Sequence, residues 1–356
     1  MIWVFVAGLA MLVLGAELLV RGASRLALSL GISPLVVGLT VVAFGTSAPE
    51  MAVSVGAALD GRTDMAIGNV VGSTIFNVLM ILGSSAVITP LLVNPQIIRQ
   101  EVPIMIGASA LLLVFGQDGR ISALDAAFLL ALLIVYTVFL IIQSRSESKD
   151  IQDEFKAEIE PKSQWDAHWW VQLGLILAGL GLLNLGSDWL VEAASSFARA
   201  LGMSDLVIAL TIVSAGTSMP ELATSIMAAV RKERDIAVGN VIGSCTFNLL
   251  GCVGVAGLAA SEGLGMAPAL LAFDLWVVLA VSLACLPIFM TGGEIARWEG
   301  AVFLGYYVAY ITYLILAAQQ HDALPAFSAT MLGFVVPLTV VTLVVTLLKP
   351  RRNLTD

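Results

Sequence analysis

Long apolar segments separated by short polar turns occupy almost the whole chain. A membrane-spanning helix needs about 20 mostly apolar residues. Eleven segments meet this requirement, at residues 2–20, 32–59, 65–87, 98–116, 121–143, 169–190, 204–230, 235–259, 267–290, 297–318 and 325–348. The pattern predicts an all-α polytopic membrane protein. Because the first segment lacks a basic leader and a small-residue cleavage site, we expect a retained helix rather than a signal peptide.

Composition supports the membrane assignment. Hydrophobic residues make up 59% of the chain and charged residues 12%, about half the charged fraction of a soluble domain. The formal net charge is −9, but six acidic residues lie between Glu147 and Glu160. We interpret these acids as a solvated linker, with a regulatory Ca²⁺ site as the alternative, and expect no nucleic-acid partner. The three cysteines lie in apolar segments, so no disulfide framework is expected.

The basic residues predict the orientation, because cytoplasmic loops hold an excess of Lys and Arg. With the N-terminus outside, 14 of the 17 basic residues fall in cytoplasmic segments. The other three are Arg62, Arg120 and Arg199. We therefore predict a multi-pass protein of the plasma (inner) membrane with its N-terminus outside and its C-terminus in the cytoplasm. Residues 144–168 become a cytoplasmic linker.

Residues 39–83 recur without a gap at residues 210–254. At an offset of 171 residues the two copies share 23 identities in 45 positions. The motifs GTSAPE and GNVVGSTIFN return as GTSMPE and GNVIGSCTFN. Apolar positions drifted, whereas carboxylate, hydroxyl and amide positions were kept. Matched polar groups inside apolar segments indicate one site built from two halves.

Each half contains five predicted spans, an odd number, so the two copies enter the membrane in opposite senses. The sequence thus predicts two inverted five-helix repeats at residues 1–143 and 169–318. An extra transmembrane helix at 325–348 has no partner and is expected at the periphery. Weaker matches outside the core align Glu17 with Asp188 and Tyr136 with Tyr310.

The repeated segment places carboxylates deep in the membrane. Glu50 lies about ten residues from the turn near Asp60, which corresponds to a depth of roughly 15 Å along a helix. Asn77 reaches a similar depth from the other side of this turn, and the second copy repeats the arrangement with Glu221 and Asn248. Two carboxylates at this depth cost several kcal/mol unless they are paired. We expect a mobile cation as the partner.

The residues before each Glu suit a hard cation. Pro49 and Pro220 cannot donate to the carbonyls of Gly45 and Gly216, so they should break the helices and release those carbonyls. Thr and Ser in GTS add hydroxyl groups within one turn. Oxygen ligands of these kinds favour Ca²⁺ and Na⁺ over soft metals. Broken helices at a repeat interface are typical of transporters.

The paired motifs resemble the two α-repeats of the sodium/calcium exchangers in the cation/calcium antiporter superfamily. The resemblance implies ten core helices and a secondary antiporter that exchanges Na⁺ for Ca²⁺ by alternating access. It also implies a site, carried over by position. Ca²⁺ would bind Glu50, Glu221 and the carbonyls of Thr46 and Thr217. Flanking Na⁺ sites would use the Ala43 carbonyl with Ser47 and Ser244 on one side, and the Ser214 carbonyl with Ser73 and Ser218 on the other. Asn77 and Asn248 would complete the centre.

Asparagine at both 77 and 248 affects the charge balance. The resemblance assigns Asp at the position of Asn248 to the potassium-dependent branch, so this chain is predicted to be K⁺-independent. Only two carboxylates remain, so the exchange would be electrogenic at the ratio of three Na⁺ per Ca²⁺ that the resemblance implies. Ser73 and Ser244 could alternatively serve interhelical packing, and the two asparagines could bind backbone only.

Other functions fit the sequence less well. An H⁺/Ca²⁺ antiporter on the same fold is the alternative, although the resemblance assigns Asn rather than Thr-Ser before Glu to that branch. A cation channel is a second alternative, which inverted repeats with broken helices disfavour. An intramembrane protease would need an Asp pair, or Ser with His or Lys, inside the spans. We therefore predict no enzyme and no cofactor, only the transported ions.

Overall fold

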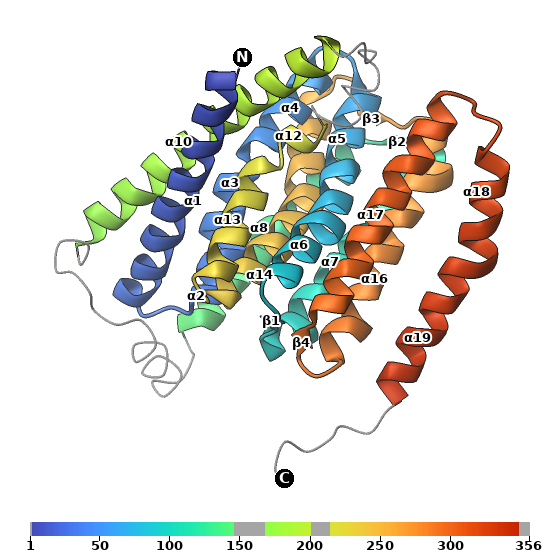
Figure 1. The fold of residues 1–356 in the computed structure, drawn as a ribbon. Helices are drawn as coiled ribbons and strands as arrows, with labels where there is room; N and C mark the ends of the chain where they lie inside the picture. Colours follow the sequence, from blue (N-terminus) through green and yellow to red (C-terminus); the bar gives the residue numbers. More distant parts are fainter. Residues whose placement is uncertain (1, 146–167, 201–213, 349–356) are drawn as a thin grey trace.

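The computed structural model describes residues 2–145, 168–200 and 214–348, which form a bundle of long helices (Figure 1). Within these residues nine helical stretches are long and apolar enough to cross a membrane. A tenth crossing is the pair Pro34–Thr46 and Ala48–Leu59, bent by 44°. Of the predicted seventh span only the part from residue 214 onwards is described. The predicted 144–168 linker lies almost entirely outside the described residues.

The helices follow the predicted order. The first half contains α1 (Ile2–Leu30), α2 (Pro34–Val37), α3 (Ala43–Thr46), α4 (Ala48–Leu59), α5 (Thr63–Phe76), α6 (Gly83–Ile88), α7 (Val102–Phe115) and α8 (Ala123–Arg145). The second half contains α10 (Trp169–Ala200), α12 (Ser214–Gly216), α13 (Met219–Val230), α14 (Arg234–Phe247), α15 (Val253–Ala259), α16 (Leu275–Met290) and α17 (Arg297–Ala318). The chain continues into α18 (Leu324–Thr330) and α19 (Val336–Leu348).

Several spans contain a wider, π-helical turn. These turns are η1 (Gly38–Val42), η2 (Asn77–Leu82), η3 (Ile97–Glu101), η7 (Asn248–Cys252), η8 (Leu270–Asp274) and η9 (Met331–Val335), and η4 (Gly116–Asp118) is a short 3₁₀ turn. Two of them occupy equivalent places in the repeats, since η2 and η7 begin at Asn77 and Asn248. Such turns often mark functional positions in helices.

Two short antiparallel bridges tie the loops together. β1 (Leu91–Leu92) pairs with β4 (Glu294–Ile295), and β2 (Arg120–Ile121) pairs with β3 (Leu264–Gly265). Each bridge joins a loop of the first repeat to a loop of the second. The pairs are interchanged by the inverted repeat, which is the symmetry expected of two units entering the membrane in opposite senses. The all-α prediction holds for the spans, and these bridges are its only departure in the described residues.

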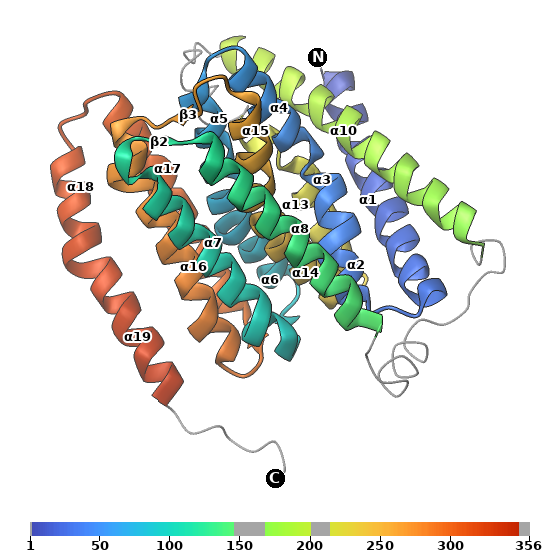
Figure 2. The same ribbon diagram turned by 180° about the vertical axis from the view of Figure 1, so that it is seen from behind.

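The helices of the first and sixth predicted spans, α1 and α10, extend further than predicted, to Leu30 and Ala200. They pack closely against each other along stripes of glycine (Figures 1 and 2). A Cβ atom on Gly15 would lie 2.8 Å from the Gly179 carbonyl oxygen, and one on Gly8 would lie 2.9 Å from the Gly186 carbonyl oxygen. The two helices therefore approach each other at backbone contact distance.

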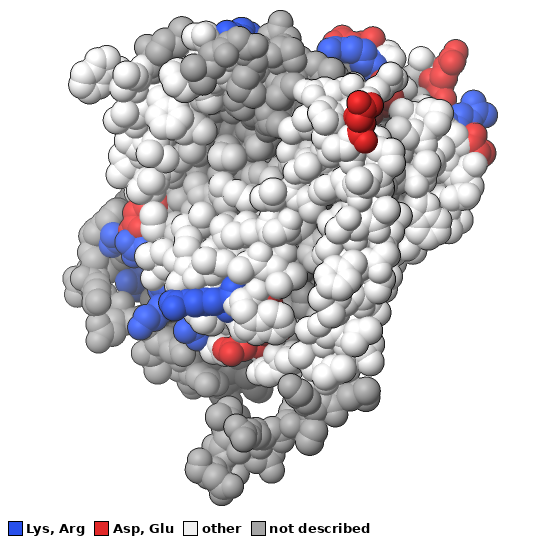
Figure 3. All heavy atoms as spheres, turned by 45° about the vertical axis from the view of Figure 1, so that its right-hand side comes forward, with Lys and Arg blue, Asp and Glu red and all other residues white. Residues whose placement is uncertain are grey.

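The motif helices form the centre of the bundle. Of the most apolar window of each span, 89% is buried for Arg234–Ala259 and 72% for Thr63–Ile88, whereas none is buried for Leu324–Thr346. The last helices, α18 and α19, stand at the edge of the bundle in Figure 1. The Tyr306 hydroxyl of α17 contacts Thr339 of α19. The peripheral position predicted for the eleventh span is confirmed. On the face drawn in Figure 3, a broad uncharged region lies between groups of charged side chains.

Candidate ion-binding site

Both motif helices are broken at the serine of GTS. Ser47 (φ −83°, ψ 6°) separates α3 from α4, and Ser218 (φ −91°, ψ 10°) precedes α13. A proline occupies the first turn of each following helix, where its missing N–H is tolerated and the preceding helix cannot continue. The predicted helix breaks are therefore confirmed. Each break puts a carboxylate in the first turn of the next half-helix, three residues after the serine.

The two breaks face each other across the repeat boundary. The Ser47 hydroxyl donates to Glu221 Oε1 at 2.9 Å, and the Ser218 hydroxyl donates to Glu50 Oε1 at 2.8 Å. All four side chains are fully buried. Residues 174 and 168 positions apart in sequence thus meet in one place. Each half supplies a hydroxyl group to the carboxylate of the other half.

Several buried polar atoms at this place, five of them side-chain oxygens and one the amide nitrogen of Asn77, have no hydrogen-bond partner. They include Glu50 Oε2, Glu221 Oε2, Thr217 Oγ1, Ser244 Oγ and both terminal atoms of Asn77. Neither Glu forms an ion pair with a Lys or Arg of the described chain. Buried polar atoms without partners are rare in folded proteins and need an explanation. Two carboxylates surrounded by neutral oxygens form a donor set that fits a hard cation.

The two asparagines of the motif differ in their contacts. Asn248 donates to the Ser73 hydroxyl at 3.0 Å and accepts from the Cys252 thiol at 3.4 Å. Asn77 has no partner at either terminal atom, and neither does its neighbour by symmetry, Ser244. All four polar residues of this group are buried. The structure therefore brings the predicted amides and serines to one centre, with only one of the two amide–serine bonds made.

The predicted backbone ligands have varied surroundings. The Ala43 carbonyl accepts the Ser47 amide at 3.0 Å and lies 3.4 Å from the Thr46 hydroxyl. Ser214 begins α12, and its side chain lies outside the described atoms. Proline at 220 was expected to leave the Gly216 carbonyl without a partner. Instead, this carbonyl accepts the Ser187 hydroxyl at 2.6 Å, so α10 satisfies it.

Two further asparagines belong to the site but have no role in the sequence analysis. Asn69 donates to the Glu50 carbonyl oxygen at 3.1 Å and to Ser54 at 3.0 Å. Asn240 donates to the Glu221 carbonyl oxygen at 3.5 Å and to Ser225 at 2.9 Å. The signal was present, because these asparagines and serines are identical in the two copies. Their importance depends on contacts that span 15 to 19 residues.

A cavity of about 650 Å³ reaches the site from one side. It is lined by Ala48, Pro49, Ala52, Val53, Asn184, Ser187, Asp188, Val191, Glu192, Gly216 and Thr217. These residues come from the first turns of α4, from α10 and from the second break. The cavity therefore places two acidic side chains near a route to the residues beside Glu50.

A family model described as sodium/calcium exchanger protein matches residues 1–142 and 171–316. The chain belongs to the sodium/calcium exchanger family. It is 38% identical over 317 residues to the putative antiporter CaxA of Alkalimonas amylolytica, covering 87% of this chain and 97% of that one. It is 32% identical over 338 residues to the sodium/calcium exchanger MaX1 of Methanosarcina acetivorans, covering 86% and 96%.

Solved structures agree with this assignment. The fold matches that of the sodium-calcium exchanger NCX_Mj soaked with 10 mM Na⁺ and 10 mM Sr²⁺, with a TM-score of 0.74 and 32% identity. The match covers 87% of this chain and 97% of that one. This member of the exchanger family is therefore a multi-pass membrane antiporter of the cation/calcium type and not an enzyme. The predicted family, fold class and transporter function are confirmed at this level.

Proposed function

We propose that the protein exchanges Na⁺ for Ca²⁺ at the site shared by the two broken helices. In this proposal Ca²⁺ binds Glu50, Glu221 and the carbonyls of Thr46 and Thr217. Na⁺ occupies flanking positions formed by the Ala43 carbonyl, Ser47 and Ser244, and by the Ser214 carbonyl, Ser73 and Ser218. Asn77 and Asn248 complete the centre. The repeats at residues 1–143 and 169–318, joined by the 144–168 linker, supply equal halves.

One observation carries the proposal: each carboxylate is held at one oxygen by a serine of the opposite repeat and leaves its other oxygen buried without a partner. A buried carboxylate pair without a basic partner is strongly unfavourable as two charges. A divalent cation between them removes that penalty. Several Na⁺ can do the same with the help of neutral hydroxyl and carbonyl oxygens.

Alternating access is supported by a difference between the two repeat-related sides of the bundle. The cavity lies between α4 and α10, where Val53 is 37% exposed. On the repeat-related side α1 packs against α13, and the equivalent residue Thr224 is fully buried. Inverted repeats exchange such environments when the opposite side opens. The proposed orientation, with the N-terminus outside, makes the cavity extracellular and the function Ca²⁺ export.

The decisive experiment compares two driving forces in proteoliposomes. We expect Ca²⁺ uptake to follow an imposed Na⁺ gradient and to remain at background level with an imposed pH gradient. Uptake driven by the pH gradient alone would favour the alternative, an H⁺/Ca²⁺ antiporter. Gradient-independent Ca²⁺ leak would favour a channel. Protein-free liposomes give the background for both.

The proposed exchange is electrogenic, because the two carboxylates neutralise one Ca²⁺ but leave one positive charge when three Na⁺ are bound. One net charge would then move in each cycle, and 100 mV would contribute about 2.3 kcal/mol to the driving force. The membrane potential is set with K⁺ and valinomycin. We expect a potential that is negative in the compartment receiving Na⁺ to accelerate the movement of Ca²⁺ out of that compartment. A flux that is independent of voltage would contradict three-to-one exchange.

Potassium independence rests on the neutral side chain at 248. The amide of Asn248 is already bonded to Ser73 and Cys252, and it adds no charge that K⁺ could compensate. We expect Na⁺-driven Ca²⁺ flux to be unchanged, within about twofold, when choline replaces K⁺. A strict need for K⁺ would contradict the assignment. Asn248→Asp is then the variant in which K⁺ dependence should be sought.

A further inference from the structure

We infer that Asn69 and Asn240 are positioning residues that take turns in bonding the opposite repeat, and that this exchange accompanies the change in sidedness. In the conformation described, Asn240 is bonded across the boundary to Thr46. In the opposite conformation, Asn69 bonds Thr217 and the first bond is released. The inference rests on the proposed alternating access, because it assigns one hydrogen-bond pattern to each side of opening.

Each asparagine holds the half-helix that carries a carboxylate. The Asn69 amide bonds the carbonyl oxygen of Glu50 itself and the Ser54 hydroxyl one turn later. The Asn240 amide makes the equivalent bonds to Glu221 and Ser225. A displacement of either asparagine would therefore move the backbone of its Glu. That direct connection makes the two residues suitable for coupling ion coordination to helix position.

The acceptor atoms of the two asparagines have different partners across the boundary. Thr46 Oγ1 lies 3.1 Å from Asn240 Oδ1. The symmetry-related hydroxyl, Thr217 Oγ1, is buried without any hydrogen-bond partner. Both threonines belong to the same GTS motif, so their side-chain chemistry is the same. The difference therefore lies in the surroundings of the two hydroxyls and not in the motif, since the Thr46 hydroxyl also lies 3.1 Å from the Val42 carbonyl oxygen of its own helix.

A second pair shows the same imbalance independently. Asn248 is bonded to Ser73 at 3.0 Å, whereas Asn77 and Ser244 have no partners. In both pairs an amide of the second repeat bonds a hydroxyl of the first, and the reciprocal bond is missing. Two separate contacts therefore differ in the same sense, as expected if a single rearrangement exchanges them together.

The imbalance coincides with the side on which the bundle is open. Val53 on α4 lines the cavity and is 37% exposed, while Thr224, its counterpart on α13, is fully buried. When the two repeats exchange conformations, α13 acquires the surroundings that α4 has here. The bonds at Thr46 and Thr217 should then exchange as well, because each depends on the placement of its own half-helix.

The test measures which side is open without measuring transport. Single cysteines Val53→Cys and Thr224→Cys report on the two sides of the purified protein in Na⁺- and Ca²⁺-free detergent buffer. The three native cysteines are buried, so the unmodified chain gives the blank. The readout is the ratio of the maleimide labelling rate at position 53 to that at position 224. Because the buffer contains no Na⁺ or Ca²⁺, a variant that binds these ions differently can still be compared by its labelling ratio.

Thr46→Val and Thr217→Val form the matched pair, because each removes one hydroxyl and keeps the backbone carbonyl and the side-chain volume. We expect Thr46→Val to lower the labelling ratio by about twofold to tenfold, the range of one hydrogen bond, and Thr217→Val not to lower it. Thr46→Ser should restore the ratio. Equal shifts in the two Val variants, or no shift in Thr46→Val, would overturn the inference.

A folding control separates these outcomes from damage. Each variant is passed over a size-exclusion column before labelling, and a Val variant that aggregates is replaced by the Ala substitution at the same position, which removes the same hydroxyl. Thr46→Ala should then lower the ratio, and Thr217→Ala should not. Equal ratios in the two Ala variants would overturn the inference in the same way.

Discussion

The half-helices α4 and α13 carry the same motif in different surroundings. α4 borders a cavity shared with α10, whereas α13 is covered by α1. At the covered end, Glu17 of α1 pairs with Arg231 just after α13. The repeat-related positions are Asp188 and Asp60, two acids that cannot pair with each other.

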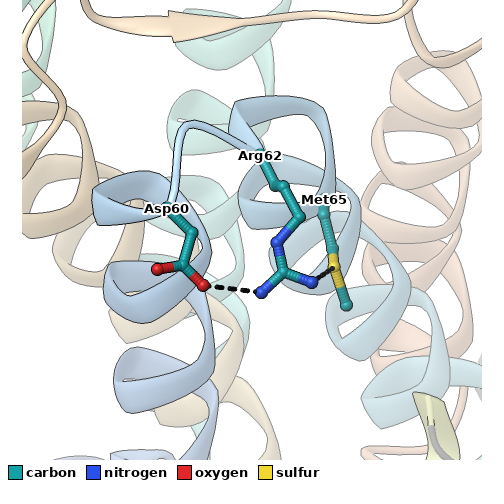
Figure 4. Close-up of polar contacts among 3 residues, drawn as sticks. All are labelled: Asp60, Arg62 and Met65. Carbon is teal, nitrogen blue, oxygen red and sulfur yellow. Dashed lines mark hydrogen bonds and ion pairs between the residues drawn. The ribbon is translucent and has the colours of Figure 1, made fainter.

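The nearby contacts reinforce this difference. Asp60 instead bonds Arg62 at 2.8 Å within its own turn, and Arg62 also reaches the Met65 sulfur (Figure 4). The ion pair at the end of α4 thus stays within its own turn, whereas the ion pair at the end of α13 reaches the neighbouring helix α1. Sequence symmetry accordingly defines the ion site, while charges outside the motif distinguish its two entrances.

The largest effect is expected from removing either glutamate charge, and it should be the same for both halves. Glu50→Gln and Glu221→Gln each remove one of two buried charges, and we expect each to reduce Na⁺-driven Ca²⁺ flux by at least about a hundredfold. Flux in proteoliposomes, with the amount of folded protein measured by size exclusion, checks this. Near-normal flux in either variant would show that the two halves do not share one site.

A smaller effect, on the free energy of unfolding, should distinguish the two halves by the hydrogen bonds that support them. Each half contains an acid–tyrosine pair, Tyr136 with Glu101 and Tyr310 with Asp274. Glu101 is fully buried and accepts two glutamine amides as well, whereas Asp274 is partly exposed. Tyr136→Phe should therefore lower the free energy of unfolding by about 1–2 kcal/mol, and Tyr310→Phe by less.

Thermal unfolding in detergent, followed by tryptophan fluorescence, provides the comparison for these tyrosine variants. Both substitutions remove a single hydroxyl group, so each is the control for the other. A larger loss of stability in Tyr310→Phe would contradict the ranking by burial.

The smallest effect concerns the closed entrance. Arg231→Gln removes the pair that holds α1 against the end of α13, and a partly exposed pair contributes about 0.2–1 kcal/mol. We expect labelling of Thr224→Cys to rise by up to about fivefold at low salt. Lys232→Gln removes the same charge one residue later and should change labelling little. Equal effects of the two substitutions would indicate a general change in surface charge.

Much of the molecule follows from the sequence because membrane insertion imposes strong local rules. Apolar length defined the spans, and the strict 171-residue offset defined the inverted repeats and both helix breaks. The prolines at 49 and 220 and the paired carboxylates indicate a cation site from the sequence alone. The lengths of α1 and α10 were underestimated, because both helices continue past the apolar stretch that marks a membrane span.

Only the tertiary structure decided how the equivalent halves differ. The serine of each break bonds the carboxylate of the other repeat, and Asn69 and Asn240 hold the backbone of the two glutamates. Neither contact can be read from spacing, because each joins segments whose separation depends on the packing of the whole bundle. The cavity between α4 and α10 has the same origin. A duplicated sequence specifies two equal halves, and only their relative placement determines which entrance is open.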